Sequence, residues 1–456
     1  MSAEPACFFA ERAWVRGGWA ANVCMTVGAD GLWSEIAVDA QAPLGAQHLQ
    51  GPVLPGLVNA HSHAFQRAIA GLTERGGAAQ DDFWRWRDRM YSAALRIAPQ
   101  QLEAIAAFLY AELLRAGYTQ VCEFHYLHND LDGRPYADAL EMSRALLRAA
   151  QRTGIGLTLL PTLYMRSGFG APGLREDQRR FASTPDSVLR IAEALAREGT
   201  PGRMRAGVAL HSLRAVPEGA LREVAAAAAR VQLPVHIHIA EQVQEVDDCL
   251  VQHGSRPIEW LLAQAKPDAR WNLVHATHTS PAELAGLKRT GAAIVICPST
   301  EANLGDGVFD LPGWLERGGN WSIGSDSHVT RSWQEELRLL EYSQRFARRA
   351  RNVAARAAGQ EASAAVLFEG ALQGGTAAAG LPLAGLAVGQ RADFMVVDME
   401  APALAGVPMD HLLDALVFSS PEAPPAAVFV AGRQARPEMP ALREDFIRAM
   451  RELWGG

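Results

Sequence analysis

A pair of histidines two residues apart is the first feature of this sequence that could do chemistry. His61 and His63 flank Ser62, and the period of two in an extended strand places both imidazoles on one face, where they can hold one metal ion. With 13 histidines in 456 residues, roughly 0.4 such pairs are expected by chance. The pair alone therefore favours two ordinary polar side chains near a strand end over a metal site.

Further candidate ligands make the metal site the favoured interpretation. His238, His275 and Asp326 each stand where a predicted strand ends. If these strands are parallel members of one barrel, their carboxyl ends meet on the face where barrel enzymes place their active sites. Several independent placements of imidazole and carboxylate groups on one rim predict a metal site with nitrogen and oxygen ligands.

The spacing of the histidines does not decide which histidine of the fifth strand is a metal ligand. His236 and His238 form a second pair of the same parity, so the pattern alone does not decide between them. Position nearer the strand end favours His238, with His236 packed in the core. Glu241 follows three residues later and can reach over the metal as a proton shuttle without being a ligand. Since His211, and no lysine, stands at the end of the fourth strand, we expect a mononuclear zinc site.

These residues require a scaffold of alternating strands and helices. Eight short β-branched or apolar runs alternate with helical patterns, which is typical of βα units and predicts a (β/α)8 TIM barrel. Two helix starts carry N-cap signals, at Thr184 before Pro185 and at Ser280 before Pro281. The eight runs are residues 53–61, 119–126, 156–164, 205–211, 233–240, 271–276, 292–297 and 321–325.

The two flanks of the barrel predict a second, smaller domain. Residues 5–50 contain short strand-like pieces broken by glycines, and residues 392–398 and 427–433 are further strand candidates. We expect both flanks to pair in one small β-sandwich domain of residues 1–51 and 381–456. This domain should pack on a barrel of residues 52–380, because no low-complexity linker separates the two.

Composition excludes several classes of protein. The chain is 49% hydrophobic and 20% charged, as in ordinary globular proteins. A formal net charge of −7 argues against a protein that binds nucleic acid or an anionic membrane surface through an excess of basic residues. The N-terminal segment lacks the basic start and apolar run of a signal peptide, and no apolar run reaches the ~18 residues of a membrane span, so we expect a cytoplasmic protein. The five cysteines contain no C-x-x-C pair and predict neither a disulfide framework nor a thiolate zinc site.

Together these motifs resemble the amidohydrolase superfamily, in its zinc-dependent deaminase branch, over almost the whole chain. The resemblance implies one zinc ion per subunit, held by His61, His63, His238 and Asp326. It also implies catalytic roles for Glu241, His275 and Asp326, and it suggests a homodimer. The stretches that carry it are residues 54–63 (LPGLVNAHSH), 238–241 (HIAE), 274–278 (VHATH), 324–326 (GSD) and 386–393 (LAVGQRAD).

A narrower resemblance is to the formimidoylglutamate deiminase family of histidine catabolism. It implies hydrolysis of N-formimidoyl-L-glutamate to N-formyl-L-glutamate and ammonia. A substrate with two carboxylates needs cations and directed donors at one end of its site, which Arg87, Tyr126 and Arg214 would supply. Gln66 and His211 would orient the polar middle of the substrate. The supporting stretches are residues 63–67 (HAFQR), 83–87 (FWRWR), 123–126 (EFHY), 211–216 (HSLRAV) and 299–307 (STEANLGDG).

Some alternatives stay open at this point. Another deaminase on the same scaffold, acting on a guanine-like or other amidine-containing ring, would have less use for two arginines. A barrel that binds metal or a partner without catalysis would not need a complete ligand set with a proton shuttle. The same ligands also accept iron or manganese. The aromatic residues 83–87 are consistent with a lid or with a subunit contact.

Overall fold

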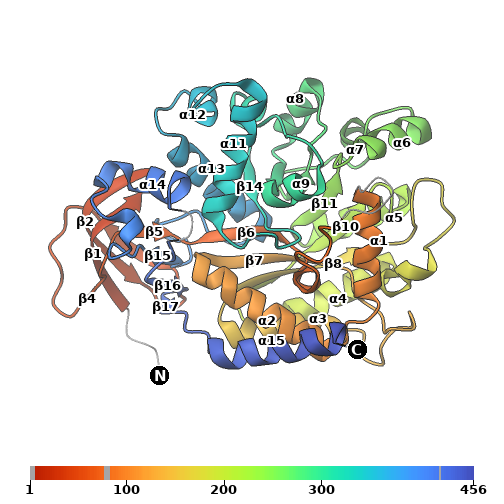
Figure 1. Ribbon diagram of the computed structural model, residues 1–456, viewed down its shortest axis with the longest axis horizontal. Coiled ribbons are helices and arrows are strands. Elements are labelled where there is room, and N and C mark those ends of the chain that lie inside the picture. Colours follow the sequence, from red (N-terminus) through yellow and green to blue (C-terminus); the bar gives the residue numbers. More distant parts are fainter. Residues whose placement is uncertain (1–5, 76–82, 421–422, 456) are drawn as a thin grey trace.

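Two sheets organise the computed structural model, which describes residues 6–75, 83–420 and 423–455 (Figure 1). The larger sheet is parallel, and its strands follow one another in the order β6, β7, β8, β10, β11, β12, β13 and β14, with β9 paired to β8. Their bounds are β6 (Leu57–Ser62), β7 (Tyr118–His125), β8 (Gly156–Leu163), β9 (Met204–Ala206), β10 (Val208–Ser212), β11 (Val235–Ile239), β12 (Trp271–His275), β13 (Ala293–Ile296) and β14 (Trp321–Ile323).

The ends of this sheet meet and close a barrel. A parallel bridge joins Ser62 to Asp326. On either side of it, the His63 amide donates to the Asp326 carbonyl (3.2 Å), and the Asp326 amide donates to the His61 carbonyl (3.0 Å). The (β/α)8 prediction is therefore confirmed. Closure also places Asp326 directly beside the histidine pair.

Helices cover the outside of the barrel, as expected for connections between parallel strands (Figure 1). Two predicted N-caps are confirmed, because Thr184 Oγ1 accepts from the Ser187 amide and Ser280 Oγ accepts from the Glu283 amide, both at 3.2 Å. The helices of the barrel are α1 (Phe83–Ala94), α2 (Pro99–Ala116), α3 (Glu141–Thr153), α4 (Pro185–Glu198), α5 (Glu218–Arg230), α6 (Val243–His253), α7 (Pro257–Gln264), α8 (Pro281–Thr290), α9 (Pro298–Leu304), α10 (Leu311–Leu315), α11 (Trp333–Arg348), α12 (Val353–Ala357) and α13 (Ser363–Ala379), with the 3₁₀ helices η1 (Ala64–Ala68) and η2 (Glu176–Phe181).

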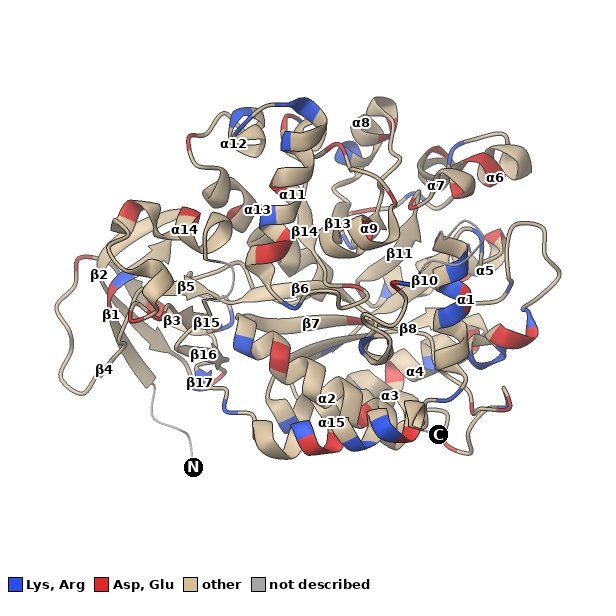
Figure 2. Cartoon of the chain, viewed as in Figure 1, with Lys and Arg blue, Asp and Glu red and all other residues tan. Residues whose placement is uncertain are grey.

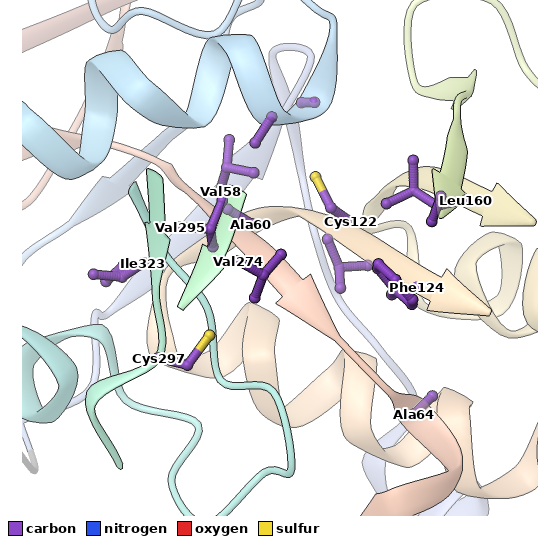
Figure 3. Packing of buried hydrophobic residues seen from close by; sticks show 14 of the residues in the cluster. Val58, Ala60, Ala64, Cys122, Phe124, Leu160, Val274, Val295, Cys297 and Ile323 are labelled. Carbon is purple, nitrogen blue, oxygen red and sulfur yellow. The ribbon is translucent and has the colours of Figure 1, made fainter. Parts of the chain in front are cut away.

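Apolar side chains fill the barrel below its carboxyl-end face (Figure 3). Val58 of β6, Val274 of β12, Val295 of β13 and Ile323 of β14 are all buried. Interiors of this kind are close-packed and resist deformation. The residues that follow the strand ends therefore project from a rigid platform.

One predicted strand is two strands in the structure. Residues 53–61 divide at Gly56 into β5 (Val53–Pro55), which belongs to the second sheet, and β6 of the barrel. A Cβ at Gly56 would overlap the side chain of Thr119 in β7, so the chain can cross here only with glycine. The prediction of one continuous strand was wrong because a buried apolar run looks the same in either sheet.

The second sheet joins both flanks of the chain, as predicted. Its strand order is β17, β16, β15, β5, β1, β2, β3, with β4 beside β1. Phe8, Trp33, Phe394 and Phe429 form its own core, and the rings of Phe394 and Phe429 stack with centroids 4.3 Å apart. The remaining strands are β1 (Ala6–Val15), β2 (Gly18–Val27), β3 (Trp33–Ala37), β4 (Gln47–His48), β15 (Phe394–Val396), β16 (Ala427–Val430) and β17 (Arg433–Gln434).

The C-terminal helices follow the barrel. They are η3 (Pro402–Leu404), η4 (Met409–His411), α14 (Leu412–Phe418) and α15 (Met439–Trp454). Helix α15 returns to the barrel and packs on α2, where Phe446 stacks on Phe108 with centroids 4.6 Å apart. The domain limits at residues 51/52 and 380/381 stay a prediction. Among the described residues, no helix has the length and apolar character needed to cross a membrane.

Candidate active site

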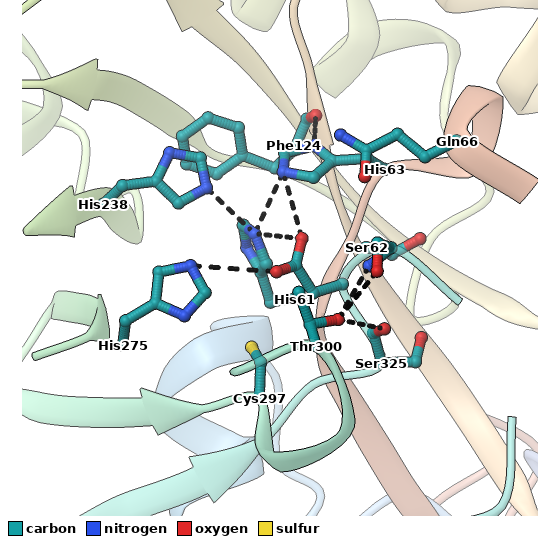
Figure 4. A network of polar contacts seen from close by, with 12 residues as sticks. His61, Ser62, His63, Gln66, Phe124, His238, His275, Cys297, Thr300 and Ser325 are labelled. Carbon is teal, nitrogen blue, oxygen red and sulfur yellow. Dashed lines mark hydrogen bonds and ion pairs between the residues drawn. The ribbon is translucent and has the colours of Figure 1, made fainter. Parts of the chain in front are cut away.

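Three imidazoles, those of His61, His63 and His238, converge at the carboxyl-end face of the barrel (Figure 4), and the carboxylate of Asp326 lies beside them. Nε2 of His61, on β6, lies 3.1 Å from Nε2 of His63 and 3.0 Å from Nε2 of His238, on β11. Oδ1 of Asp326 is 3.5 Å from His61 Nε2 and 3.4 Å from His63 Nε2. Ligand atoms that share one ion at about 2 Å must lie at such separations.

The protonation of the histidines suits a metal ion. Burial lowers the pKa of His61, His63 and His238 below the ordinary value, so each imidazole is neutral and carries a lone pair. Nδ1 of His63 donates to the Phe124 carbonyl (2.8 Å) and Nδ1 of His238 to the His211 carbonyl (2.9 Å), which leaves both Nε2 atoms unprotonated. Both of these lone pairs point at Nε2 of His61, from 3.1 Å and 3.0 Å, and a neutral His61 has at most one proton there to offer them. The donor set therefore fits a divalent metal ion.

The backbone at the strand ends is strained. Ala240 (φ 51°), His275 (φ 69°) and Asp326 (φ 48°) all adopt left-handed backbone, which is uncommon outside glycine. Such conformations cluster at functional sites and persist only where the surroundings fix them. Ala240 stands between His238 and Glu241 in the sequence. His275 lies next to Glu241 and Asp326, and Asp326 is itself a candidate ligand.

Acidic and basic groups surround the centre on one side. Nε2 of His275 lies 3.7 Å from Oε1 of Glu241 and 3.7 Å from Oδ2 of Asp326. Burial raises the pKa of Glu241 to about 7. Burial on its own would lower the pKa of His275, but the carboxylates of Glu241, Glu301 and Asp326 outweigh it and raise that pKa to about 10. A carboxyl group that titrates near neutrality is suited to proton transfer in both directions.

All five residues predicted to contact a substrate line one pocket above the histidine cluster. Nε2 of Gln66 donates to the Tyr126 hydroxyl at 3.1 Å, and the His211 ring packs against Tyr164 with centroids 4.1 Å apart. The predicted residues in the pocket wall are Gln66, Arg87, Tyr126, His211 and Arg214, together with His63, His238, Glu241, His275 and Asp326. Their individual roles remain predictions.

The aromatic residues at the start of α1 hold both arginines. The Arg87 guanidinium lies over the rings of Trp84 (4.6 Å) and Tyr91 (5.5 Å), and that of Arg214 lies over Trp84 (5.4 Å) and Phe83 (5.9 Å). These contacts are cation–π interactions, and basic residues gather along α1 (Figure 2). Phe83, Trp86 and Arg87 line the pocket of their own chain. The two interpretations of this segment, a lid and a subunit contact, both stay open.

Three buried polar atoms at this end of the pocket lack hydrogen-bond partners among the described residues. They are Nε of Arg87, Nε of Arg214 and Oε1 of Gln66. Leaving such groups buried and unpaired costs free energy. A polar ligand in the pocket is the expected partner for them.

Two comparisons place the chain among known proteins. The model of the amidohydrolase family matches residues 53–435. The formimidoylglutamate deiminase of Pseudomonas aeruginosa is 50% identical over 425 residues, which are 93% of each chain. The chain belongs to the amidohydrolase family.

Solved structures are similar to this amidohydrolase over nearly its full length. An amidohydrolase from Brucella melitensis has a TM-score of 0.92 and 42% identity, and the match covers 98% of this chain and 99% of that one. An adenosine deaminase from Xanthomonas campestris, solved with bound zinc, has a TM-score of 0.80 at 20% identity over 99% of each chain. At that identity the second likeness shows a shared fold.

Several buried acids of this amidohydrolase were missed by the sequence reasoning. Glu123, on β7, accepts from the Ala64 amide and the Ser62 hydroxyl, both at 2.6 Å, and so clamps the chain on either side of His63. Oε1 of Glu301, on α9, lies 3.2 Å from His275 Nδ1. For Glu123 the available signal was an acid within a run predicted to be a buried strand, residues 119–126, because buried carboxylates are rare unless paired. Glu301 lies outside the predicted strands and carried no such signal.

The choice between the two histidines of β11 agrees with the structure. Nε2 of His236 donates to the Ala378 carbonyl at 2.9 Å, and its side chain is fully buried. It lies below the cluster in the core, whereas His238 joins the cluster. The interpretation of His236 as a core histidine is confirmed.

Proposed function

We propose that this amidohydrolase is a zinc-dependent formimidoylglutamate deiminase, which hydrolyses N-formimidoyl-L-glutamate to N-formyl-L-glutamate and ammonia in histidine degradation. One observation carries the proposal: a cluster of three imidazoles and a carboxylate shares its pocket with Arg87 and Arg214. A dicarboxylate substrate needs both halves of that pocket. The relative of that name in Pseudomonas aeruginosa supports the choice of substrate.

The metal would be held by His61, His63, His238 and Asp326. Zinc bound there would lower the pKa of water toward ~7 and would so supply a hydroxide nucleophile at neutral pH. Imidazole and carboxylate are common zinc ligands, and the adenosine deaminase of the same fold was solved with zinc.

Proton transfer is assigned to Glu241. It takes one proton from the attacking water and delivers it to the formimidoyl nitrogen, which leaves a tetrahedral carbon that bears a hydroxyl and an amine. The hydroxyl proton then passes to the same nitrogen as the C–N bond breaks, so that ammonia leaves and the formyl C=O forms. A carboxyl with a pKa of about 7 suits both steps. His275 and Asp326, 3.7 Å apart, orient the attacking water, and His275 stabilises the negative charge that develops on its oxygen.

Substrate recognition is assigned to the far wall of the pocket. Arg87 and Arg214 bind the carboxylates through paired N–H donors, and the Tyr126 hydroxyl adds a directed donor. Gln66 and His211 orient the polar middle of the substrate. A homodimer is part of the same proposal and rests on the family resemblance; sedimentation analysis would test it.

Ammonia release from N-formimidoyl-L-glutamate by the zinc-loaded protein tests the function. N-Formimidoyl-glycine and guanine serve as comparison substrates. Rapid turnover of the dicarboxylate alone supports the reaction and its recognition of two carboxylates. Activity on guanine alone would retain the deaminase chemistry and contradict the substrate. Absence of release from all three with zinc fully bound would contradict the enzyme assignment.

A further inference from the structure

A buried acid outside the assigned machinery lies directly behind the recognition wall. Glu245 stands in the first turn of α6 and its side chain is completely buried. A carboxylate costs free energy at such a place unless a charged or hydrogen-bonding partner compensates for burial. The contacts of Glu245 therefore indicate what it does.

Glu245 contacts both a recognition residue and the proton shuttle. Its Oε2 accepts a hydrogen bond from the backbone amide of Glu241 (3.2 Å) and lies 3.8 Å from Nε of Arg214. Nη2 of the same guanidinium lies 3.7 Å from Oε2 of Glu241. Arg214 therefore faces two carboxylates at similar distances, Glu245 through Nε and Glu241 through Nη2.

Neither carboxylate holds Arg214 in a direct hydrogen bond. Charged N–H···O bonds are typically about 2.7–2.9 Å long, and both separations exceed that. Nε of Arg214 and Oε1 of Glu245 have no hydrogen-bond partner within the described part of the chain. Loss of one carboxylate charge would let the guanidinium move to the other.

We propose that Glu245 is a positioning residue that holds the Arg214 guanidinium away from Glu241 and presents it to a carboxylate of the substrate. The inference rests on the proposed function, because Arg214 is there assigned to substrate recognition and Glu241 to proton transfer. Without the Glu245 charge, Arg214 closes onto Glu241. The closed pair removes a donor from the substrate and occupies the carboxylate that must transfer protons.

Glu245→Gln tests the charge with little change in shape, since the amide oxygen can still accept from the Glu241 backbone. We expect kcat/KM for N-formimidoyl-L-glutamate to fall by about tenfold or more, with a higher KM and a lower kcat. Glu245→Asp keeps the charge and should recover part of the loss. The same Glu245→Gln change in an Arg214→Ala background should cost less than about twofold, because the residue acts through Arg214. Equal losses in both backgrounds would overturn the proposal.

Glu283→Gln is the matched control. Glu283 is also buried in the first turn of a helix, α8, and pairs with Arg256 at 2.9 Å, but it does not line the pocket. We expect a lower thermal midpoint with KM and kcat nearly unchanged. A kinetic loss like that of Glu245→Gln would show that general destabilisation explains both variants, against the proposal.

A crystal structure of Glu245→Gln gives a readout that needs no turnover. We expect the Arg214–Glu241 separation to shorten from 3.7 Å to a direct hydrogen bond of about 2.9 Å. An unmoved guanidinium would overturn the proposal, even if Arg214→Ala is too weak for kinetics. Wild-type protein without activity on the substrate would instead contradict the proposed function, and the crystal structure would still test how Arg214 is held.

Discussion

The two ends of the active-site pocket are built in different ways. At the metal end, His61 and His238 come from strands of the barrel, and backbone carbonyls fix the ring of His63 and that of His238. At the recognition end, Arg87 and Arg214 lie against aromatic rings of α1 and keep buried Nε groups without hydrogen-bond partners.

The two ends therefore differ in whether the hydrogen bonds of their polar side chains form before a ligand binds or only with the ligand. At the metal end, the rings of His63 and His238 are oriented by backbone carbonyls that exist before anything binds, an arrangement that tunes metal sites, whereas Nδ1 of His61 has no hydrogen-bond partner among the described residues. The recognition end satisfies its polar groups only when a ligand supplies partners. Substitutions at the first end should change metal content, whereas those at the second should change substrate affinity at constant metal content.

Removal of a metal-end imidazole should have the largest effect. We expect His238→Ala to lose bound metal and ammonia release to fall by at least ~10³-fold, about 4 kcal/mol of barrier. Metal analysis and turnover measure this. His236→Ala, two residues away on the same strand, is the control and should keep its metal. Metal retained by His238→Ala and lost by His236→Ala would reverse the assignment.

Glu241 sits where the two ends meet, and its removal should separate chemistry from metal binding. Glu241→Gln should lower kcat by at least ~10²-fold because it removes general acid–base transfer. Metal content should stay equal to that of the wild type, as measured on the same samples. Turnover near the wild-type rate would contradict the proton-transfer role.

A change at the recognition end should leave metal untouched. We expect Arg87→Ala to raise KM for N-formimidoyl-L-glutamate by about 10–100-fold, the equivalent of a charged hydrogen bond of about 1.5–3 kcal/mol. Arg89→Ala is the matched control on α1, because Arg89 donates to the Thr73 carbonyl (2.6 Å) and lies outside the pocket wall. An equal rise in KM for both variants would contradict a specific role of Arg87 in binding the substrate.

The smallest effect concerns Glu336, a buried acid of α11 that lies outside both ends of the pocket and binds Ser299 of α9. Burial raises the pKa of Glu336 from 4.5 to about 8, although hydrogen bonds from the hydroxyl (2.6 Å) and amide (2.9 Å) of Ser299 oppose the shift. The folded protein therefore holds a proton that the unfolded chain has released between pH 4.5 and 8, so stability should decline as pH rises through this range. Thermal midpoints from pH 5 to 9 should show a flatter profile for Glu336→Gln. Identical profiles would contradict the shift.

Most of the metal end could be predicted from the sequence. A ligand at a strand end depends on the period of a strand and on the meeting of parallel strand ends, both of which the residue pattern carries. Position alone favoured His238 over His236 as a ligand; in the structure His238 lies in the histidine cluster and His236 in the core, and the ligand role itself stays a prediction. The recognition residues needed the family resemblance, since Arg87 and Arg214 lie on separate elements that only the folded chain brings together.

The contacts of the buried acids near the site, and the boundary between two strands, could not be predicted from the sequence for a different reason. Glu123, Glu245 and Glu301 act through partners that are set by how the elements pack at the strand ends. The residue pattern shows an acid but not its partner. The division of residues 53–61 at Gly56 likewise depends on the approach of Thr119 from a neighbouring strand.

The pairing of β5 with β15 sets an order of events during synthesis. Leu54 pairs with Met395, so the strand that leads into the histidine pair must wait for most of the polypeptide to leave the ribosome before it gains this antiparallel neighbour. Contacts of such long sequence separation form late and slow folding. Nascent chains that end before β15 can already pair β5 with β1, through Ala13 and Val53, but the other edge of β5 is still unpaired. We therefore expect the entry to β6, and with it the proposed metal site, to reach full stability only after β15 has left the ribosome.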